Sequence, residues 1–270
     1  MNFKRFAAAV SAVAVVCLFL LSGCGAAGDK SGGDLLAQIQ EKGEINIGLE
    51  GTWAPWGYHD ESGELVGYDV EVGQKIAEKL GVKAVFSEGP WDSLLAGVES
   101  GRYDTMINGV DVDESRSKTY DFSTPYAYNR TVVIVRADDD SIQSMEDLSG
   151  KSTANTLSST YANVAESYGA SVTPVDDFIQ TIELLMDGRI DATLNAEVSF
   201  QDYIAIHPDA PVKIACVDPA ATQVAIPFQK GENTRTLREA VDQALAELAQ
   251  DGTLAELSVK YFGIDISSAG

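Results

Sequence analysis

Cysteine and histidine are scarce in this 270-residue chain, which has three cysteines and two histidines. Neither His59 nor His207 has a Cys or His neighbour at the spacing of metal ligands, which argues against a histidine-based metal site or catalytic triad. Export would remove Cys17 and modify Cys24, so Cys216 has no partner for an internal disulfide. The apolar run around Cys216 favours a buried small hydrophobe over a reactive thiol. We therefore expect no metal, no cofactor and a fold stabilised by its core.

Positive charge is also scarce: 19 Lys and Arg stand against 41 Asp and Glu, a formal net charge of −22. Such a surface repels phosphate backbones and anionic lipid headgroups, so we expect no nucleic-acid partner. The acidic residues are spread along the chain, which is typical of a solvated surface. The Gly-containing segment 97–102 lacks the Lys-Ser/Thr ending of a phosphate loop. Nothing in these patterns requires an enzyme.

The N-terminal apolar run is too short to cross a bilayer. Phe6–Leu21 has 16 residues, whereas a membrane-spanning helix needs roughly 18–20. Lys4 and Arg5 precede this run and small residues follow it, the pattern of a secretory signal.

The end of this run, Leu-Ser-Gly-Cys at 21–24, resembles a bacterial lipobox, whose cysteine is acylated. We predict a lipoprotein signal peptide at 1–23, lipidation of Cys24 and a linker from the lipid anchor at 24–42. Two or more acyl chains would hold the protein stably on the extracytoplasmic face of the cell membrane. An ordinary signal peptide that happens to end near a cysteine is the alternative.

Strand-like and helix-like patterns alternate after the linker. The rhythm restarts after residue 136, which indicates two lobes, and the alternation predicts an α/β chain with mostly parallel sheets. Expected strands are 44–49, 82–86, 104–107, 131–136, 152–156, 171–175, 192–195, 212–215 and 222–227. Expected helices are 69–80, 91–99, 145–148, 159–168, 177–186, 197–206 and 234–250.

Aromatic and polar residues stand where several predicted strands end. Trp53 and Trp56 follow the first strand, and Trp91 begins a helix after Gly89-Pro90. Side chains at the carboxyl ends of strands in an open α/β sheet are well placed to line a ligand site. Burial in the core is the alternative for Trp53 and Trp56, and for Trp56 the two interpretations are balanced.

Groups suited to an anion occur in both predicted lobes. Asn108 and Asp111 follow the strand 104–107, and Arg116 lies shortly beyond them. The planar fork of an arginine near free backbone N–H groups suits a carboxylate. Ser159 and Thr160 open a helix, whose free N–H groups also suit an anion. These groups would face one crevice between the lobes.

Several motifs together resemble one family, the extracytoplasmic solute-binding proteins of ABC transporters for polar amino acids (solute-binding family 3). The resemblance covers residues 43 to about 266, and residues 175–177, 191–195 and 207–210 look most like cystine-binding members. The motifs are Gly-Tyr-Asp-Val-Glu-Val at 67–72 with Ile76, Ala77 and Leu80, Trp-Asp-Ser-Leu-Leu at 91–95, Gly-Arg-Tyr-Asp at 101–104, Tyr-Asp-Phe-Ser-Thr-Pro-Tyr at 120–126, Gly-Arg-Ile-Asp-Ala at 188–192, Asp-Gly-Thr-Leu at 251–254 and Lys-Tyr-Phe-Gly at 260–263.

The resemblance implies a fold of two lobes that close on a ligand, the type II periplasmic-binding-protein-like fold. Each lobe would be a mostly parallel sheet flanked by helices. Lobe 1 would comprise 43–129 and 225–266, and lobe 2 would comprise 131–222. A two-strand hinge would lie near 129–131 and 223–225.

The same resemblance implies roles for the candidate site residues. Trp53 and Trp91 would sandwich the side chain of the ligand, and Glu50 would touch it. Lobe 1 would hold the α-amino-acid head group through Gly109, Asp111 and Arg116. Lobe 2 would hold the ligand carboxylate through Ser159 and Thr160.

One departure from the family pattern concerns the ligand ammonium. The family usually has an aspartate where this chain has Ala196, and that aspartate pairs with the α-ammonium. Position 111, usually Ser or Thr, is Asp here, so the carboxylate would have moved to the other lobe. Glu197 is the second candidate, and a ligand without an α-ammonium is the third possibility.

The resulting expectation is a monomeric, lipid-anchored binding protein that delivers a polar amino acid, with cystine the first candidate, to an ABC transporter permease. A sensor that signals through a partner is one alternative. The other is an enzyme resembling cyclohexadienyl dehydratase, in which Asp111, Glu50 or Glu197 would act as general acid or base.

Overall fold

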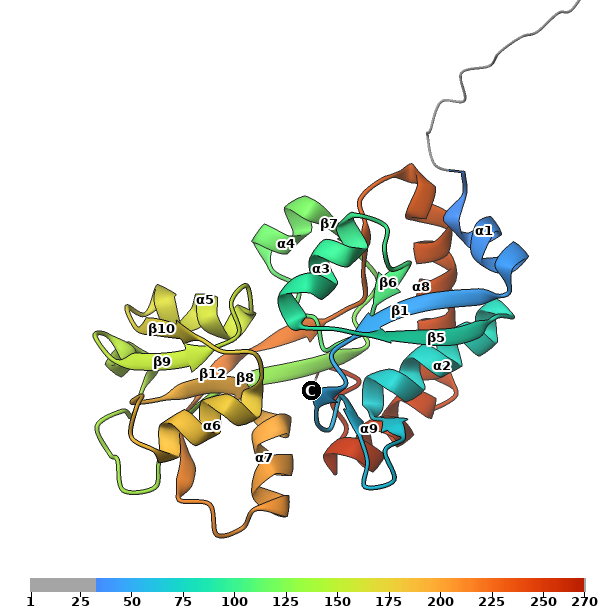
Figure 1. The fold of residues 1–270 in the computed structure, drawn as a ribbon. Helices are drawn as coiled ribbons and strands as arrows, with labels where there is room; N and C mark the ends of the chain where they lie inside the picture. The colour runs from blue at the N-terminus through green and yellow to red at the C-terminus, as the bar shows by residue number, and fades with distance from the viewer. Residues whose placement is uncertain (1–32, 270) are drawn as a thin grey trace, which may run out of the picture. The chain divides into compact units, whose positions relative to one another are not determined.

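A computed structural model describes residues 33–269, which fold into two lobes connected by two long strands (Figure 1). The predicted signal peptide, Cys24 and the beginning of the predicted linker lie outside the described residues. Among the helices of residues 33–269, none is long and apolar enough to cross a membrane.

Lobe 1 is built on a parallel sheet of order β5-β1-β6, made of Lys83–Glu88, Glu44–Leu49 and Thr105–Met106. A small antiparallel sheet, β2 (Thr52–Trp53), β3 (Gly57–His59) and β4 (Leu65–Val66), follows β1. A strand pair, β7 (Tyr120–Phe122) and β13 (Pro227–Gln229), completes the lobe. The helices are α1 (Leu35–Lys42), α2 (Tyr68–Leu80), α3 (Trp91–Glu99), α4 (Glu114–Thr119), α8 (Arg235–Gln250) and α9 (Thr253–Phe262), with the 3-10 helix η2 (Glu232–Thr234) before α8.

Lobe 2 has a mixed sheet. β9 (Ser152–Asn155) and β10 (Ser171–Pro174) are parallel, whereas β11 (Thr193–Ala196) pairs antiparallel with β8 (Ala127–Arg136). A parallel bridge between Thr153 and Ala192 connects the two parts. The lobe adds the helices α5 (Thr160–Ser167), α6 (Phe178–Met186) and α7 (Glu197–Ile206) and the 3-10 helix η1 (Met145–Leu148).

Two long antiparallel strands link the lobes. β8 (Ala127–Arg136) pairs with β12 (Val212–Val224) from Ala127 opposite Val224 to Arg136 opposite Val212, with two register shifts. Figure 1 shows both strands running from lobe 1 into the sheet of lobe 2. The sequence predicts two separate strands, 212–215 and 222–227, in this region. In the structure 212–224 is one strand, because bulged pairing with β8 continues across the polar segment, and Pro227 already belongs to the next strand, β13.

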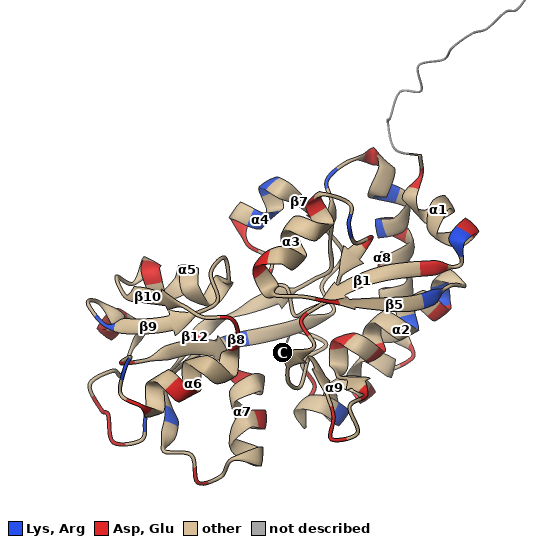
Figure 2. Cartoon of the chain, viewed as in Figure 1, with Lys and Arg blue, Asp and Glu red and all other residues tan. Residues whose placement is uncertain are grey.

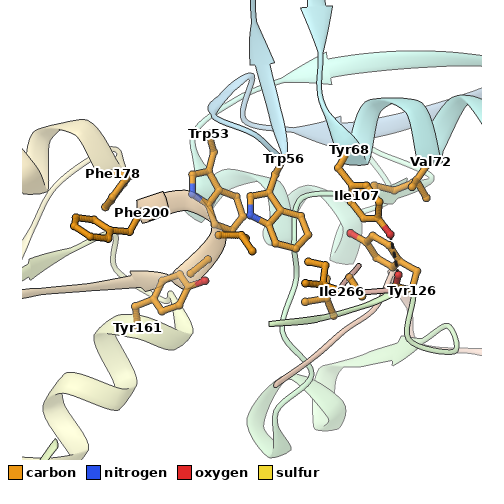
Figure 3. Packing of buried hydrophobic residues seen from close by; sticks show 14 of the residues in the cluster. Trp53, Trp56, Tyr68, Val72, Ile107, Tyr126, Tyr161, Phe178, Phe200 and Ile266 are labelled. Carbon is orange, nitrogen blue, oxygen red and sulfur yellow. Dashed lines mark hydrogen bonds between the residues drawn. The ribbon is translucent and has the colours of Figure 1, made fainter. Parts of the chain in front are cut away.

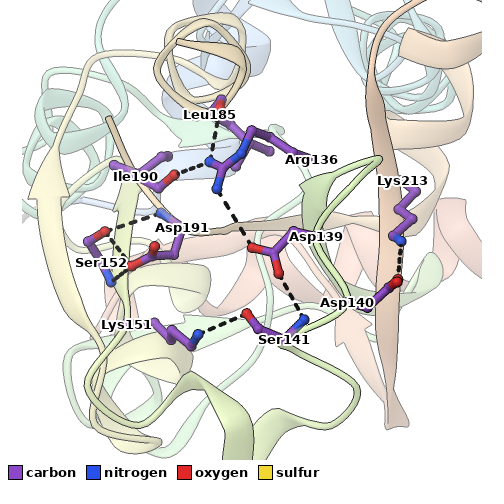
Figure 4. Close-up of polar contacts among 10 residues, drawn as sticks. All are labelled: Arg136, Asp139, Asp140, Ser141, Lys151, Ser152, Leu185, Ile190, Asp191 and Lys213. Carbon is purple, nitrogen blue, oxygen red and sulfur yellow. Dashed lines mark hydrogen bonds and ion pairs between the residues drawn. The ribbon is translucent and has the colours of Figure 1, made fainter. Parts of the chain in front are cut away.

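Polar contacts fasten the part of lobe 2 near the end of β8 (Figure 4). The Arg136 guanidinium donates hydrogen bonds to the main-chain oxygens of Ile190 at 2.8 Å and Leu185 at 3.3 Å. The Asp191 carboxylate accepts hydrogen bonds from the main-chain nitrogen and the hydroxyl of Ser152. These contacts tie the loop before β11 to β8 and β9.

The largest buried side chains of lobe 1 form an aromatic cluster beside the small sheet (Figure 3). Trp56 is fully buried, and its ring lies 4.9 Å from that of Phe262 and 5.9 Å from that of Tyr68, measured between centroids. The Tyr68 hydroxyl donates to the main-chain oxygen of Tyr126 at 2.9 Å. Burial of aromatic surface is the main stabilising term in such a core.

The predicted linker 24–42 is wrong in its last part, because residues 35–42 form helix α1. The Asp34 side chain caps this helix by accepting from the Ala37 nitrogen, and Gly43 ends it with φ +74°. Ile39 is buried, and Asp34 also accepts a hydrogen bond from Thr236 at 2.7 Å. The last residues of the predicted linker are thus a docked part of lobe 1.

Candidate ligand-binding site

The principal pocket of the described residues lies between the lobes, at the ends of their strands. Lobe 1 contributes Glu50, Thr52, Trp53, Trp91, Gly109, Asp111 and Arg116 to its lining. Lobe 2 contributes Asn155, Thr156, Ser159, Thr160, Tyr161, Asp177, Phe178, Thr181 and Asn195.

Tryptophans from two elements form apolar walls. Trp53 stacks on Trp56 with ring centroids 5.3 Å apart and an interplanar angle of 18°. Figure 3 shows the Trp53 ring near Tyr161 and on the side of Trp56 that faces Phe178. Trp91, at the start of α3, packs its ring against the Arg116 guanidinium at 5.2 Å. Trp56 is absent from the pocket lining, which favours the core interpretation for this residue.

Arg116 is the one cationic side chain in the pocket lining of the described chain. It is 6% exposed, and Asp113 caps its short helix α4. The guanidinium donates to the main-chain oxygens of Asp111 at 2.9 Å and Ser158 at 3.0 Å, the second of which belongs to lobe 2. These bonds fix the fork so that its pocket-facing side suits a carboxylate.

Asp111 brings a carboxylate to the same end of the pocket. It is 4% exposed, and its Oδ1 accepts a hydrogen bond from the Thr222 hydroxyl of β12 at 2.7 Å. Burial raises the pKa of Asp111 above its ordinary value, although Thr222, the Arg116 charge and Thr160 oppose that rise. A cationic group beside Asp111 would therefore stabilise the charged carboxylate.

Gly109 allows the turn between β6 and Asp111 to approach Trp53. Its φ is +55°, and a Cβ atom there would lie 2.6 Å from the Trp53 ring. The turn is fixed from behind by Asp69 of α2, whose buried carboxylate accepts hydrogen bonds from the Gly109 nitrogen and the Tyr126 hydroxyl, both at 2.6 Å. Burial raises the pKa of Asp69 to about 7.

Glu50 extends from the end of β1 into the pocket. Its Oε2 accepts a hydrogen bond from the Asn108 amide at 2.8 Å, and its own nitrogen donates to Asn108 Oδ1 at 2.8 Å. Burial raises the pKa of Glu50 to about 7, and the charges of Asp177 and Asp92 add to the rise. Asn108 was expected among the ligand-binding residues. It is absent from the lining and holds Glu50 instead.

The N-terminus of α5 brings hydroxyl groups into the pocket from lobe 2. Ser159 caps the helix by accepting from the Ala162 nitrogen at 3.1 Å, and Thr160 follows it. Ser158 has a φ of +54°, which non-glycine residues seldom adopt. Its hydroxyl donates to Asp92 of lobe 1 at 2.5 Å, so this turn joins the two lobes.

Glu197, the second candidate for the ammonium partner, is corrected by the structure. Its Oε2 accepts from the Arg130 guanidinium at 2.7 and 2.8 Å, and the residue is absent from the pocket lining. Glu197 is the first residue of α7, and the preceding Ala196 is buried without lining the pocket. Asp111 is thus the acidic candidate that reaches the pocket at the Arg116 end.

Eight lining residues were not singled out from the sequence. The placement rule that indicated Ser159, at the carboxyl end of a strand, also applies to Asn155, Thr156 and Asn195. It applies to Asp177 and Phe178, which begin α6 after β10. The sequence carries no signal for the remaining three, because their place in the lining depends on how their local elements are oriented: Thr52, Tyr161 and Thr181.

The chain matches the family model for bacterial extracellular solute-binding proteins, family 3, over residues 45–264. A protein of Haemophilus influenzae named "Probable amino-acid ABC transporter-binding protein" is 39% identical over 235 residues, covering 87% of this chain and 91% of that protein. The L-cystine-binding protein TcyA of Bacillus subtilis is 37% identical over 260 residues, covering 94% and 96%. These relatives are named as binding proteins.

Two solved structures share the fold. An ancestral arginine-binding protein bound to arginine has a TM-score of 0.76 at 35% identity, covering 82% of this chain and 99% of that one. The L-cystine solute receptor of Neisseria gonorrhoeae, in its unliganded open conformation, has a TM-score of 0.60 at 40% identity, covering 88% and 100%. The expected type II two-lobed fold is confirmed. With its α/β lobes, its pocket and these matches, the chain belongs to the bacterial extracellular solute-binding proteins, family 3, as an ABC-type amino-acid solute-binding protein.

Proposed function

We propose that this protein is the lipid-anchored, extracytoplasmic binding component of an ABC importer and that its ligand is a polar amino acid, L-cystine being the first candidate. The observation that carries the proposal is that the Arg116 guanidinium and the Asp111 carboxylate both line one end of a pocket walled by tryptophans. A carboxylate on Arg116 and an ammonium on Asp111 match the two charges of an α-amino acid.

The arrangement of the lobes supports a ligand held between them. Arg116 contacts Ser158 across the pocket, Ser158 contacts Asp92, and the Trp56 indole donates to the Ser199 hydroxyl of α7 at 3.2 Å. The arginine-bound relative superposes better than the open cystine receptor, although the latter is more similar in sequence. Both observations favour an arrangement in which the lobes enclose the ligand.

Cystine is preferred because of sequence similarity to named cystine-binding proteins. TcyA and the gonococcal receptor are 37% and 40% identical to this chain. The acidic surface agrees with a small-molecule ligand and argues against nucleic acid, since Asp and Glu outnumber Lys and Arg on both lobes (Figure 2).

Calorimetric titration of the purified protein tests the ligand. L-cystine should bind with micromolar or tighter affinity, and L-glutamine and L-arginine serve as comparison ligands. Saturable binding of a different amino acid would support an amino-acid-binding protein but would replace cystine as its ligand. The absence of heat with every amino acid would contradict the proposal.

Mass spectrometry of the membrane fraction from native cells tests the anchor. An acylated N-terminal peptide that begins at Cys24 is expected from the Leu-Ser-Gly-Cys sequence. An unmodified N-terminus at another residue would remove the lipid anchor from the proposal and leave the ligand site untouched.

A further inference from the structure

The charges that line the pocket do not balance for a simple zwitterionic ligand. Glu50, Asp111 and Asp177 supply three carboxylates, while Arg116 is the single cation among the lining residues of the described chain. The carboxylate of an amino acid would pair with Arg116 and its ammonium with Asp111. Glu50 and Asp177 would then face the ligand with no counter-charge.

These two carboxylates form their own end of the pocket. Asp111 lies within the influence of the Arg116 charge, whereas the Asp177 charge acts on the pKa of Glu50, so the three carboxylates divide into Asp111 beside Arg116 and the pair of Glu50 and Asp177. A second cavity shares Glu50, Thr52 and Asp177 with the first and continues outward to Glu88 and Asp176. The pocket therefore has an inner end at Arg116 and Asp111 and an outer end at Glu50 and Asp177.

Neither outer carboxylate has a cationic partner within residues 33–269. Glu50 is held by the Asn108 amide, and Asp177 accepts hydrogen bonds from the Gln180 nitrogen at 2.9 Å and the Gln180 amide at 3.0 Å. These neutral donors orient both carboxylates but leave their charges uncompensated. Two like charges that line one pocket raise each other's energy unless a cation lies between them.

An independent group also calls for a donor from the ligand. Asn155 lines the pocket and is 2% exposed, and its Oδ1 has no hydrogen-bond partner in the described chain. Its amide nitrogen donates to the Leu194 oxygen at 2.7 Å, which fixes the orientation of the amide. The free oxygen is thus an acceptor, and a buried acceptor without a donor is costly.

We propose that the ligand carries a second cationic nitrogen besides its α-ammonium, held between Glu50 of lobe 1 and Asp177 of lobe 2. This inference rests on the proposed amino-acid function. Two ligand classes supply such a group: the second ammonium of cystine and the side chain of a basic amino acid. Because the two carboxylates come from different lobes, the same cation would also favour closure.

Matched ligands test the inference by calorimetry. L-arginine and L-citrulline differ mainly in the charge of the distal group. L-cystine and the mixed disulfide of L-cysteine with 3-mercaptopropionate differ by the second ammonium. At least one cationic member should bind, with an affinity about tenfold or more above that of its neutral partner, and which pair responds identifies the source of the cation.

Variants connect that preference to the two carboxylates. Glu50→Gln combined with Asp177→Asn should reduce the preference within the responding pair to less than threefold. Asp209→Asn combined with Glu256→Gln, which removes two exposed charges, controls for net charge and should retain the preference. An unchanged preference in the double variant would overturn the assignment.

The panel also separates this inference from the proposed function. Tight binding of L-glutamine together with failure of every ligand that has a second cation would leave an amino-acid-binding protein and overturn the inference. Failure of every amino acid would overturn the proposed function, and the inference with it.

Discussion

At the scale of single residues, the proposed head-group site depends on Arg116. Its fork is buried, is fixed by two main-chain oxygens and lies against the Trp91 ring. A ligand carboxylate there would be largely removed from water, where a charged hydrogen bond is stronger than at the surface.

Replacing Arg116 by alanine should weaken binding of the amino-acid ligand roughly 30-fold or more. Loss of one partner of a buried charge pair costs about 2–5 kcal/mol. Calorimetry measures the effect, and circular dichroism checks the fold. Arg235→Ala, which removes an exposed arginine of α8, is the control. A change below threefold in Arg116→Ala would show that the carboxylate binds elsewhere.

Glu50 should make the stability of the empty protein depend on pH. Its pKa rises from an ordinary 4.5 to about 7, so between these values the native state keeps a proton that the unfolded chain releases. Stability therefore falls as pH rises through this window. Glu50→Gln should match the wild type below about pH 4.5 and exceed it at pH 8 in thermal melts.

Comparing Glu50→Gln with the wild type isolates the pH dependence due to Glu50, because Asp69, whose pKa is also raised, titrates in both proteins. Glu256→Gln, at an exposed position of α9, should show no such pH-dependent gain. If the advantage of Glu50→Gln were constant with pH, desolvation of the carboxylate would not be its cause.

At the scale of elements, turns place the site as much as helices and strands do. Gly109 and Gly150 both have positive φ, at +55° and +76°. They differ in surroundings: a Cβ on Gly109 would collide with Trp53, whereas a Cβ on Gly150 meets nothing within 4 Å. Alanine substitutions at the two glycines therefore separate the effect of backbone strain from the effect of displacing Trp53 in the pocket wall.

Gly150→Ala should cost about 1 kcal/mol of stability and leave ligand affinity unchanged, because only the backbone is strained. Gly109→Ala should cost more and weaken binding about tenfold or more, because Trp53 must move. Denaturant unfolding and calorimetry measure the two effects. Equal affinities in the two variants would mean that Trp53 does not form the wall that the ligand touches.

Many elements were predictable from local patterns. The strand 44–49 and the helices 91–99 and 197–206 have the predicted bounds. Helices α1, α4 and α9 were missed: α4 is only six residues long, and α1 is stabilised by docking on lobe 1. Periodicity detects long amphipathic segments, whereas short helices depend on caps and tertiary contacts.

The site was only partly predictable for a similar reason. Trp53, Trp91, Asp111 and Arg116 line the pocket and carried a signal in residue type and position. Asn108 supports Glu50 and does not line the pocket, whereas Asp177 lines it and was not predicted. Both outcomes depend on the direction of the side chain, which the sequence does not record. Glu197 lies outside the pocket lining and pairs with Arg130, which the pairing of β8 with β11 brings next to it in space.

At the scale of the whole molecule, binding and closure should be coupled through contacts between the lobes. The Trp56 indole of lobe 1 donates to the Ser199 hydroxyl of lobe 2 at 3.2 Å, although Trp56 lies outside the pocket. This bond is made only when the lobes meet, so it adds to ligand affinity without touching the ligand.

Ser199→Ala should weaken ligand binding by roughly fivefold, because a hydrogen bond is worth about 1 kcal/mol and the indole N–H would be left unpaired. Small-angle scattering of the ligand-saturated protein should remain close to that of the wild type. Ser167→Ala, in α5 of the same lobe, should bind normally. An unaltered affinity in Ser199→Ala would remove Trp56 from the closure mechanism.

The central claim is that this chain binds an amino acid between its lobes. A thermal-shift screen tests this claim most directly. The purified protein is melted with each of the twenty amino acids and with L-cystine. A ligand present at 100 times its dissociation constant adds about 2.7 kcal/mol to stability, which raises the melting temperature by several degrees. We predict such a rise with at least one polar amino acid and its loss in Arg116→Ala. No rise with any member of the panel would contradict the account.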